Sequence, residues 1–301
     1  MSIPKNLSNN DTYMHWREKK LENYPRKIEE ITVKVGIPGF PNKQQIKELK
    51  RICSKTNIAI YEAAQEIIED KNIALNMGLS LGLKIIERSL TTDEDGVSEL
   101  STTNTKARSN YIPYTNKPLG WHTDGCYNDT NQLINGFLLH CVRSAEQGGE
   151  NHLLDPDIAY ILLRDENPEF IDGLMLPDAL TIPQNSQNSR ILREKRTGPI
   201  LTILSRNCMS DVGTIHFRYT SRKTFVYWKK DARITDALNF IKQTLQNDCP
   251  YIFRVKLKPG SGLIGNNVLH NRTGFQEGDS EYTKRLIYRI YYQDKIGMNS
   301  T

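Results

Sequence analysis

Residues 1–90 carry hydrophobic positions that are spaced mainly as on one face of a helix. Such a face repeats every three or four residues, whereas a strand alternates every two. Hydrophobic residues alternate between Ile31 and Ile37, which predicts a strand that ends at Pro38. The helical spacing predicts helices at four places: 11–22 with Asp11 as its N-cap, 46–52, 58–68 and 73–90.

From residue 111 onward the pattern changes to short strands with a few helical insertions. Asp155 followed by Pro156 is a typical helix start, because aspartate caps the first turn and proline fits its first position. A further helix is predicted over 231–247 and a strand over 251–258. The mixture predicts an α+β fold.

Residues 91–110 separate these two parts and contain few hydrophobic residues. Two interpretations stay open for this polar segment. It could be a mobile lid that closes over a site, or a disordered connector that cannot bury enough apolar surface to fold.

The run 284–292 (KRLIYRIYY) is rich in aromatic and β-branched residues and predicts a strand. Alternation places Arg285 and Arg289 on the same face, together with apolar residues. Burying two guanidinium groups is costly unless an anion accompanies them. The strand is therefore a candidate for binding a carboxylate, which the guanidinium fork can hold with two hydrogen bonds.

The composition is that of an ordinary globular protein, with 301 residues, 38% hydrophobic and 25% charged. Neither a membrane-spanning segment nor a secretory signal is recognisable, so a cytoplasmic protein is expected. Five cysteines without metal-type spacing are expected to be reduced thiols. Cys126 stands out, because it lies close to the candidate metal ligands described next and could be oxidised there.

A candidate metal site begins with His122 and Asp124, which lie two positions apart in the run Trp121–Gly125. On a strand, both side chains would point to one face. A third ligand is expected from His270, at the end of a predicted strand–turn–strand hairpin with its turn at 265–267. Two imidazoles and one carboxylate form the set that holds Fe(II) and leaves coordination positions open.

Six short motifs, in this order, resemble the TauD/TfdA-like family of Fe(II)- and 2-oxoglutarate-dependent dioxygenases. The resemblance covers roughly residues 105–295. Within the family, the motifs around 122 and 148 are most similar to the γ-butyrobetaine hydroxylase side. The motifs are HTDG (122–125), LLHC (138–141), GGEN (148–151), HFRYTSR (216–222), LHNRTGF (269–275) and KRLIYR (284–289).

The resemblance implies a double-stranded β-helix (jelly-roll) core with flanking helices. Residues 91–301 would form the dioxygenase core, and residues 1–90 would pack on it within one structural unit. The implied iron ligands and catalytic residues are His122, Asp124 and His270. The implied cofactors are Fe(II), 2-oxoglutarate as co-substrate and O2. Because Asp124 is present, the resemblance favours hydroxylation or oxidative cleavage over halogenation.

The resemblance also assigns the co-substrate site. Arg285 matches the arginine that binds the distal carboxylate of 2-oxoglutarate, and Arg289 matches a second arginine that in some members helps to bind it. Asn151 stands where many relatives have Thr or Ser, and its amide can still donate a hydrogen bond. Residues bordering the iron motif could line the substrate pocket, although core packing accounts for Trp121 equally well: Trp121, Tyr127 and Asn128.

Three functions stay open from the sequence. The leading one is a dioxygenase that acts on a small, charged molecule, and a homo-oligomer is compatible with it. The second is a related scaffold that binds metal or ligand without turnover. The third is a nucleic-acid-associated protein, suggested by the basic stretch 190–230 but supported by no nucleic-acid-binding motif, so nucleic acid is not the expected partner. The other histidines are interpreted as structural or surface residues: His15, His140, His152 and His216.

Overall fold

The computed structural model combines α-helices with mainly antiparallel sheets, which confirms the α+β prediction. It divides into two compact units, each built from three chain segments: unit 1 comprises 1–24, 121–130 and 154–252, and unit 2 comprises 25–120, 131–153 and 253–301. The expected boundary between 90 and 91 stays a prediction. The described residues are 3–4, 9–63, 68–88, 92–102, 111–129, 132–187, 190–205, 212–222, 226–278 and 280–297.

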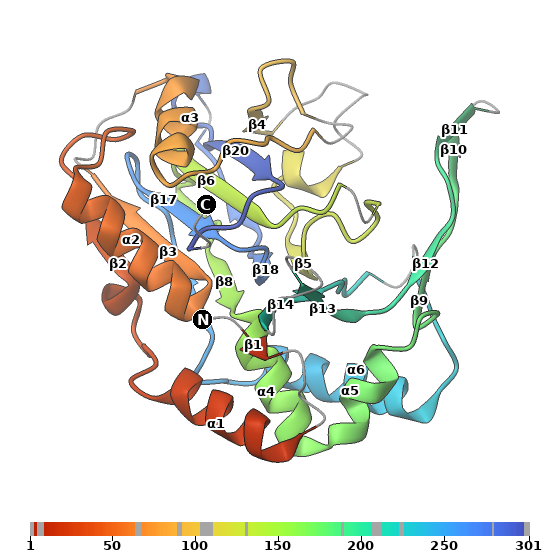
Figure 1. Cartoon of the computed structure of the whole chain (residues 1–301). Helices are drawn as coiled ribbons and strands as arrows, with labels where there is room; N and C mark the ends of the chain where they lie inside the picture. The colour runs from red at the N-terminus through yellow and green to blue at the C-terminus, as the bar shows by residue number, and fades with distance from the viewer. Residues whose placement is uncertain are drawn as a thin grey trace. The chain divides into compact units, whose positions relative to one another are not determined.

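Unit 2 is built around a six-stranded sheet with the order β2-β3-β17-β6-β20-β4 (Figure 1). A second sheet has the order β16-β8-β18-β5, and β19 pairs with β7. Two strands cross the division between the units, β5 (Leu119–His122) and β8 (Asn151–Leu154). The other elements of unit 2 are η1 (Ile28–Ile31), β2 (Thr32–Lys34), α2 (Lys43–Thr56), β3 (Ile58–Glu62), α3 (Lys71–Ser80), β4 (Ser98–Leu100), η2 (Ile112–Tyr114), β6 (Gly136–Arg143), β7 (Gln147–Gly148), β16 (Phe253–Val255), β17 (Gly262–Gly265), β18 (Leu269–Arg272), β19 (Phe275–Gln276), η3 (Glu281–Thr283) and β20 (Leu286–Tyr292).

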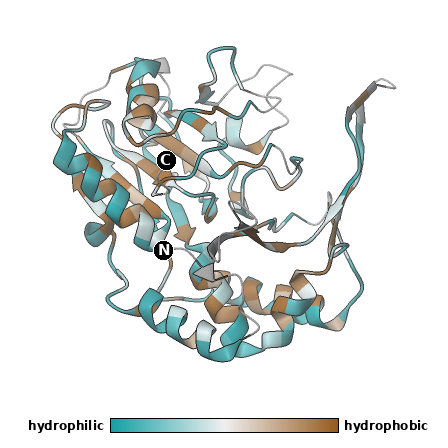
Figure 2. Cartoon of the chain, in the orientation of Figure 1, coloured by the Kyte–Doolittle hydropathy of each residue, from teal (hydrophilic) through white to brown (hydrophobic). Residues whose placement is uncertain are grey.

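The central strands of the six-stranded sheet are buried and largely hydrophobic (Figure 2). Strand β17 pairs with β6 on one side and β3 on the other, and it carries glycine at both ends. A Cβ on Gly262 would collide with the Tyr61 ring, and one on Gly265 would collide with the Phe137 ring. These glycines therefore let two neighbouring aromatic rings approach the β17 backbone closely.

Helix α2 shows how local sequence defines an element of unit 2. The side chain of Asn42 accepts a hydrogen bond from the Gln45 backbone, and the Gln45 side chain accepts one in return, so the first turn has a complete capping box. Asn57 ends the helix in the left-handed conformation. Between these caps, Leu49 and Ile52 are buried, as the predicted helix over 46–52 requires.

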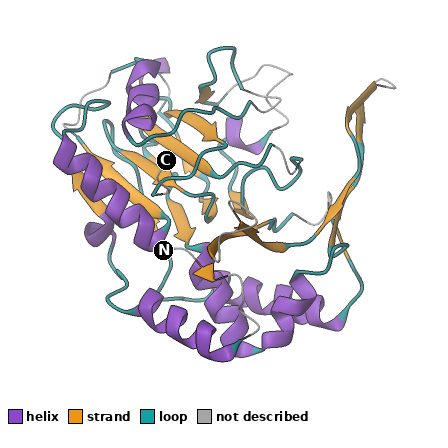
Figure 3. Ribbon diagram, in the orientation of Figure 1, coloured by secondary structure: helices purple, strands orange, loops and turns teal. Residues whose placement is uncertain are grey.

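The described residues of unit 1 form four helices and several short sheets (Figure 3). Three of these helices, α4, α5 and α6, pack on one another. Strands β10 and β11 form a two-stranded sheet among the described residues, and they project from β9 and β12 (Figure 1). The elements of unit 1 are β1 (Ile3–Pro4), α1 (Asn10–Leu21), α4 (Pro156–Glu166), α5 (Pro168–Leu174), β9 (Leu180–Ile182), β10 (Asn185–Gln187), β11 (Arg190–Arg193), β12 (Arg196–Gly198), β13 (Leu201–Ser205), β14 (Val212–Phe217), β15 (Tyr227–Trp228) and α6 (Ala232–Gln246).

A fully buried ion-pair cluster ties the first helix of unit 1 to α4. Lys20 lies at 0% exposure, with its Nζ 2.8 Å from Asp155 Oδ2 and 2.6 Å from Asp157 Oδ2. The Tyr24 hydroxyl also donates a hydrogen bond to Asp155. Asp155 caps α4 as predicted, but its carboxylate has a second role as a partner of a buried lysine.

The helix predicted over 58–68 is wrong. Residues Ile58–Glu62 form β3, and 64–67 lie outside the described residues. A short run that is hydrophobic at every position fits a helix or a fully buried strand equally well. The β-branched residues Ile58 and Ile60 and pairing on both sides, with β2 and β17, favour the strand.

The predicted hairpin before His270 is also wrong. Its two arms, β17 and β18, belong to different sheets, the six-stranded and the four-stranded one. Asn267, with a φ of 50°, turns the chain between them. The predicted turn at 265–267 therefore exists, but it connects the six-stranded sheet to the four-stranded sheet.

Other predicted elements are confirmed with shifted ends. Helix α1 begins one residue earlier than expected and is capped by Asn9 instead of Asp11. The strand at 31–37 is limited to β2, and the helix at 73–90 is limited to α3. Within 91–110, residues Ser98–Leu100 pair with β20 as β4, while 103–110 lie outside the described residues. No helix of the described ranges has the length and apolarity needed to cross a bilayer.

Candidate metal and co-substrate site

His122 and Asp124 lie next to each other in unit 1, although not on one strand as predicted. His122 is the last residue of β5, and Asp124 follows in a turn. The His122 Nε2 and Asp124 Oδ1 atoms are 3.7 Å apart. Thr123 holds this segment, because its hydroxyl donates to the Phe217 carbonyl at 2.7 Å and its backbone donates to Tyr219 at 2.9 Å.

His270 lies on β18 and is buried at 8% exposure. Its Nδ1 lies 2.9 Å from the carbonyl oxygen of Val268, an acceptor, so Nδ1 carries the proton and Nε2 presents its lone pair. The Phe137 ring stacks on the imidazole with centroids 5.1 Å apart. A histidine whose second nitrogen is fixed by a backbone carbonyl is a typical metal ligand.

His122, Asp124 and His270 form a group in which one ligand atom from each lies within 4.8 Å of the others. Two neutral imidazoles and one carboxylate suit a divalent transition metal, and Fe(II) takes this donor set in enzymes that keep positions open for other ligands. The chemistry of the donors therefore fits the metal that the sequence predicted.

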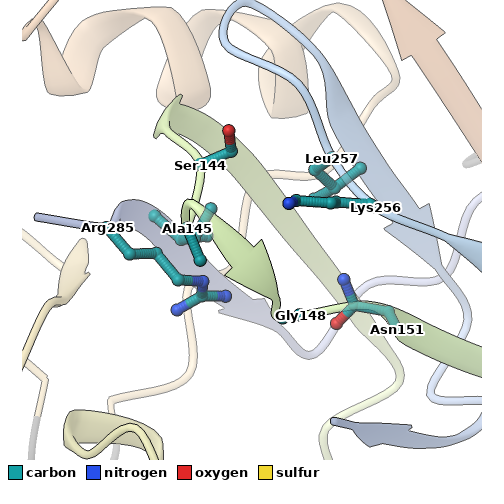
Figure 4. Close-up of a pocket in the computed structure, with 9 residues that line it drawn as sticks. Ser144, Ala145, Gly148, Asn151, Lys256, Leu257 and Arg285 are labelled. Atoms are coloured by element: carbon teal, nitrogen blue, oxygen red, sulfur yellow. The ribbon is translucent and has the colours of Figure 1, made fainter. Parts of the chain in front are cut away.

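Arg285 and Asn151 line one small pocket of unit 2 (Figure 4). Arg285 precedes β20 and is 4% exposed, and Asn151 opens β8 and is 4% exposed. Among the described residues, no carboxylate forms an ion pair with the Arg285 guanidinium, which lies over the Phe275 ring at 5.1 Å. Burial lowers the pKa of Arg285 to about 10, so the group is still cationic at neutral pH.

Sequence reasoning did not identify two other polar residues of this pocket, Ser144 and Lys256. Lys256 donates from Nζ to the Glu146 carbonyl at 3.0 Å and adds a second positive charge to the lining. It falls within the predicted strand 251–258, and alternation alone does not say what its side chain meets. Figure 4 shows that Lys256, just after β16, and Arg285, just before β20, line the same pocket.

Arg289 lies on β20, whose residues are all buried, and is 8% exposed. Its guanidinium lies 4.3 Å from the centre of the Tyr291 ring. It is outside the set of residues that line the pocket of Arg285. A direct contact of Arg289 with the co-substrate therefore stays a prediction.

The three residues predicted to border the metal differ in exposure. Trp121 is 9% exposed on β5, which agrees with core packing, and Tyr127 is 39% exposed. The backbone of Asn128 donates to Gly125 and closes the turn after Asp124. Burial raises the pKa of the neighbouring Cys126 thiol to about 11, although the positive charges of Arg218 and Arg193 oppose this rise.

Other histidines occupy structural surroundings. His140 is buried on β6, with Nδ1 2.9 Å from the Tyr61 hydroxyl, and burial lowers its pKa to about 4. His152 lies 3.0 Å from Glu150, His216 is buried on β14, and His15 is exposed.

The chain belongs to the TauD/TfdA family of dioxygenases. The family model described as "Taurine catabolism dioxygenase TauD, TfdA family" matches residues 19–291. The resemblance identified from the sequence motifs is thereby confirmed, and it extends into the N-terminal part.

Two curated relatives share a name that concerns nucleotides. A uridine-5'-phosphate dioxygenase from Amycolatopsis sp is 29% identical over 184 residues, which are 58% of this chain and 60% of the relative. A uridine-5'-phosphate dioxygenase from Streptomyces sp is 27% identical over 205 residues, 65% of this chain and 69% of the relative. The match to the Amycolatopsis protein thus spans less than two thirds of its length.

Solved structures of iron oxygenases have a similar fold. An asparagine oxygenase in complex with Fe(II), 2S,3S-3-hydroxyasparagine and succinate has a TM-score of 0.58 at 13% identity, covering 84% of this chain and 78% of that one. The non-heme iron oxygenase OrfP in complex with Fe, succinate and (3S)-hydroxy-L-Arg has a TM-score of 0.59 at 14% identity, covering 84% and 81%. At these identities the likeness shows the fold.

Proposed function

We propose that this protein is an Fe(II)- and 2-oxoglutarate-dependent dioxygenase in which His122, Asp124 and His270 hold the iron. The observation that carries the proposal is the donor set, two imidazoles and one carboxylate with ligand atoms within 4.8 Å of one another, in a member of the TauD/TfdA family. When bound, the ferrous ion would supply oxygen activation coupled to decarboxylation of 2-oxoglutarate, with succinate and CO2 as co-products.

The protein's own residues would bind and orient the co-substrate. Arg285 has a buried positive charge without a carboxylate partner among the described residues, and a guanidinium binds a carboxylate through two parallel hydrogen bonds. Asn151 lines the same pocket and would donate an amide hydrogen to the same ligand. The apolar side chains around β6 and β20 would exclude water from the reacting groups.

The proposed substrate is a small anionic molecule, and uridine 5'-phosphate is the first to test because both curated relatives carry it in their names. Either hydroxylation or oxidative cleavage of that molecule agrees with a carboxylate at position 124. The fold of unit 2, with one six-stranded and one four-stranded antiparallel-rich sheet, supports the more specific proposal of a jelly-roll core. Cys53, Cys126, Cys141 and Cys249 form no disulfide among the described residues, which agrees with the proposed reducing cytoplasmic location.

The test is succinate formation by the purified full chain supplied with 2-oxoglutarate, O2 and Fe(II). The proposal requires that succinate appears, that chelation of iron abolishes it and that uridine 5'-phosphate or another small anion stimulates it. A protein that binds iron and 2-oxoglutarate but forms no succinate with any small anion would be a binding scaffold, and the proposed activity would then be wrong.

A further inference from the structure

Three arginines of unit 1 contact the loop that follows the proposed metal ligand Asp124. The guanidinium of Arg218 donates to the Cys126 carbonyl from Nε at 2.9 Å and from Nη2 at 2.7 Å. Arg193 lies 5.4 Å from the centre of the Tyr127 ring, and Arg196 pairs with Asp129. The loop 125–129 is thus held by cationic side chains from the stretch 190–218, which the sequence had marked as basic.

Two of these charges are not neutralised within the described part of the chain. Arg196 forms an ion pair with Asp129. In contrast, Arg193 donates to the backbone carbonyl of Pro183, and Arg218 donates to the backbone carbonyls of Pro199 and Cys126. A carbonyl accepts a hydrogen bond without cancelling a charge. Half-buried guanidinium groups are stabilised when an anion completes their surroundings.

The two guanidinium groups are held differently. Arg193 Nε is buried and has no hydrogen-bond partner among the described residues. Arg218 is accommodated by Gly198, because a Cβ there would lie 2.8 Å from Arg218 Nη1. Gly198 thus leaves space for the Arg218 guanidinium, and Arg193 has an unused donor beside the loop that contains Tyr127.

We propose that Arg193 and Arg218 bind the phosphate group of a phosphomonoester substrate and so determine the specificity of the proposed dioxygenase. A phosphate dianion has several acceptor oxygens, so it can accept hydrogen bonds from the Arg193 fork and be attracted by the positive charge of Arg218, whose Nε and Nη2 already donate to Cys126. Arg193 also packs on the ring of Tyr127, which fixes the plane of its fork. The inference depends on the proposed function, since it assigns the substrate of that same site.

The test compares the binding of uridine 5'-phosphate and uridine to the full chain loaded with Fe(II) and 2-oxoglutarate without oxygen, by calorimetry. The wild type is expected to bind the phosphate at least about tenfold more tightly than the nucleoside, because charge-assisted hydrogen bonds discriminate by roughly tenfold to hundredfold. Arg193→Gln should remove most of this difference and leave the affinity for uridine unchanged. Arg193→Lys, which keeps the charge without the fork, should fall between the two.

Lys195→Gln is the matched control, because Lys195 is exposed two residues away and the substitution changes the net charge equally. It should bind both ligands as the wild type does. Equal weakening by Lys195→Gln and Arg193→Gln would show a general charge effect and overturn the proposal. A wild type that does not distinguish the phosphate from the nucleoside, or does not bind the phosphate, would overturn it as well.

Succinate formation by the wild type separates this inference from the proposed function. Phosphate-dependent binding without succinate would support the arginine site and contradict the dioxygenase activity. Succinate formation stimulated only by molecules that lack phosphate would support the activity and contradict the arginine site.

Discussion

At the scale of single residues, the account depends on the chemical difference between the three proposed iron ligands. Asp124 supplies the negative charge of the set, whereas His122 and His270 are neutral donors when they bind metal. His270 is oriented by the Val268 carbonyl and by the Phe137 ring, and Asp124 is positioned by the hydrogen bonds of Thr123. His270 and Asp124 are therefore held by their own neighbours.

Asp124→Ala should lower the iron content and the rate of succinate formation by more than about hundredfold, because it removes the anionic ligand. Metal analysis of the purified protein and a succinate assay measure the two effects. Asp178→Ala removes a carboxylate that pairs with Lys229 at the surface and should leave both values unchanged. Full iron content in Asp124→Ala would contradict the assigned ligand.

Arg285→Lys should raise the KM for 2-oxoglutarate by roughly tenfold or more, because an ammonium group cannot reproduce two parallel hydrogen bonds. The kcat at saturating 2-oxoglutarate should change less than the KM. Arg254→Lys, at an exposed position of β16, is the control. An unchanged KM in Arg285→Lys would show that the carboxylate of the co-substrate binds elsewhere.

At the scale of elements, the contact between β17 and β6 links the packing of the sheet to the proposed metal ligand. Gly265 pairs with Phe137, whose ring stacks on His270. Gly265→Ala would push its Cβ into that ring and should cost about 1–3 kcal/mol of unfolding free energy. We also expect weaker iron binding, because the ring that supports the imidazole must move.

Gly36→Ala is the matched control for this substitution, since an added Cβ there meets nothing within 4 Å. Urea unfolding and iron titration of the two variants provide the comparison. If Gly265→Ala were as stable as Gly36→Ala and bound iron equally well, the proposed support of His270 through Phe137 would be wrong.

The buried cluster between α1 and α4 predicts a large effect far from any catalytic group. Lys20→Met would leave Asp155 and Asp157 buried without their cation and should cost about 3–5 kcal/mol of unfolding free energy. Lys19→Met, at an exposed position of the same helix, should cost little. Equal urea midpoints for the two variants would refute the role of the cluster.

The same cluster gives a pH dependence. Burial opposes the charge of Lys20, but Asp155 and Asp157 outweigh it and raise the pKa above 10.5. The contribution of Lys20 to the free energy of unfolding is therefore complete below about pH 10.5. It is lost as the pH rises through the pKa that Lys20 has in the folded state.

Local patterns predicted some elements well and others not. The helices over 43–56, 156–166 and 232–246 have caps and hydrophobic faces within their own sequence, and their existence followed from it. Strand β3 and the separation of β17 from β18 depend on partners far along the chain, which spacing alone does not reveal. The candidate metal ligands were predicted from the two-residue spacing of His122 and Asp124 and from the family motifs, which place them at specific positions.

At the scale of the whole molecule, the family match extends over segments of both units. The match covers residues 19–291 and so includes Lys20, the metal-ligand candidates and Arg285. The sequence could not predict the buried partners of Lys20, nor which arginines contact loop 125–129. Both depend on side chains that only the folded chain brings together.

The measurement that tests the central claim most directly is an anomalous diffraction map of crystals grown with Fe(II) and 2-oxoglutarate without oxygen. The account predicts one iron peak about 2.0–2.2 Å from a nitrogen of His122, an oxygen of Asp124 and Nε2 of His270, with the distal carboxylate of 2-oxoglutarate on Arg285. An iron peak that His270 does not ligate, or one coordinated by other residues, would contradict the account.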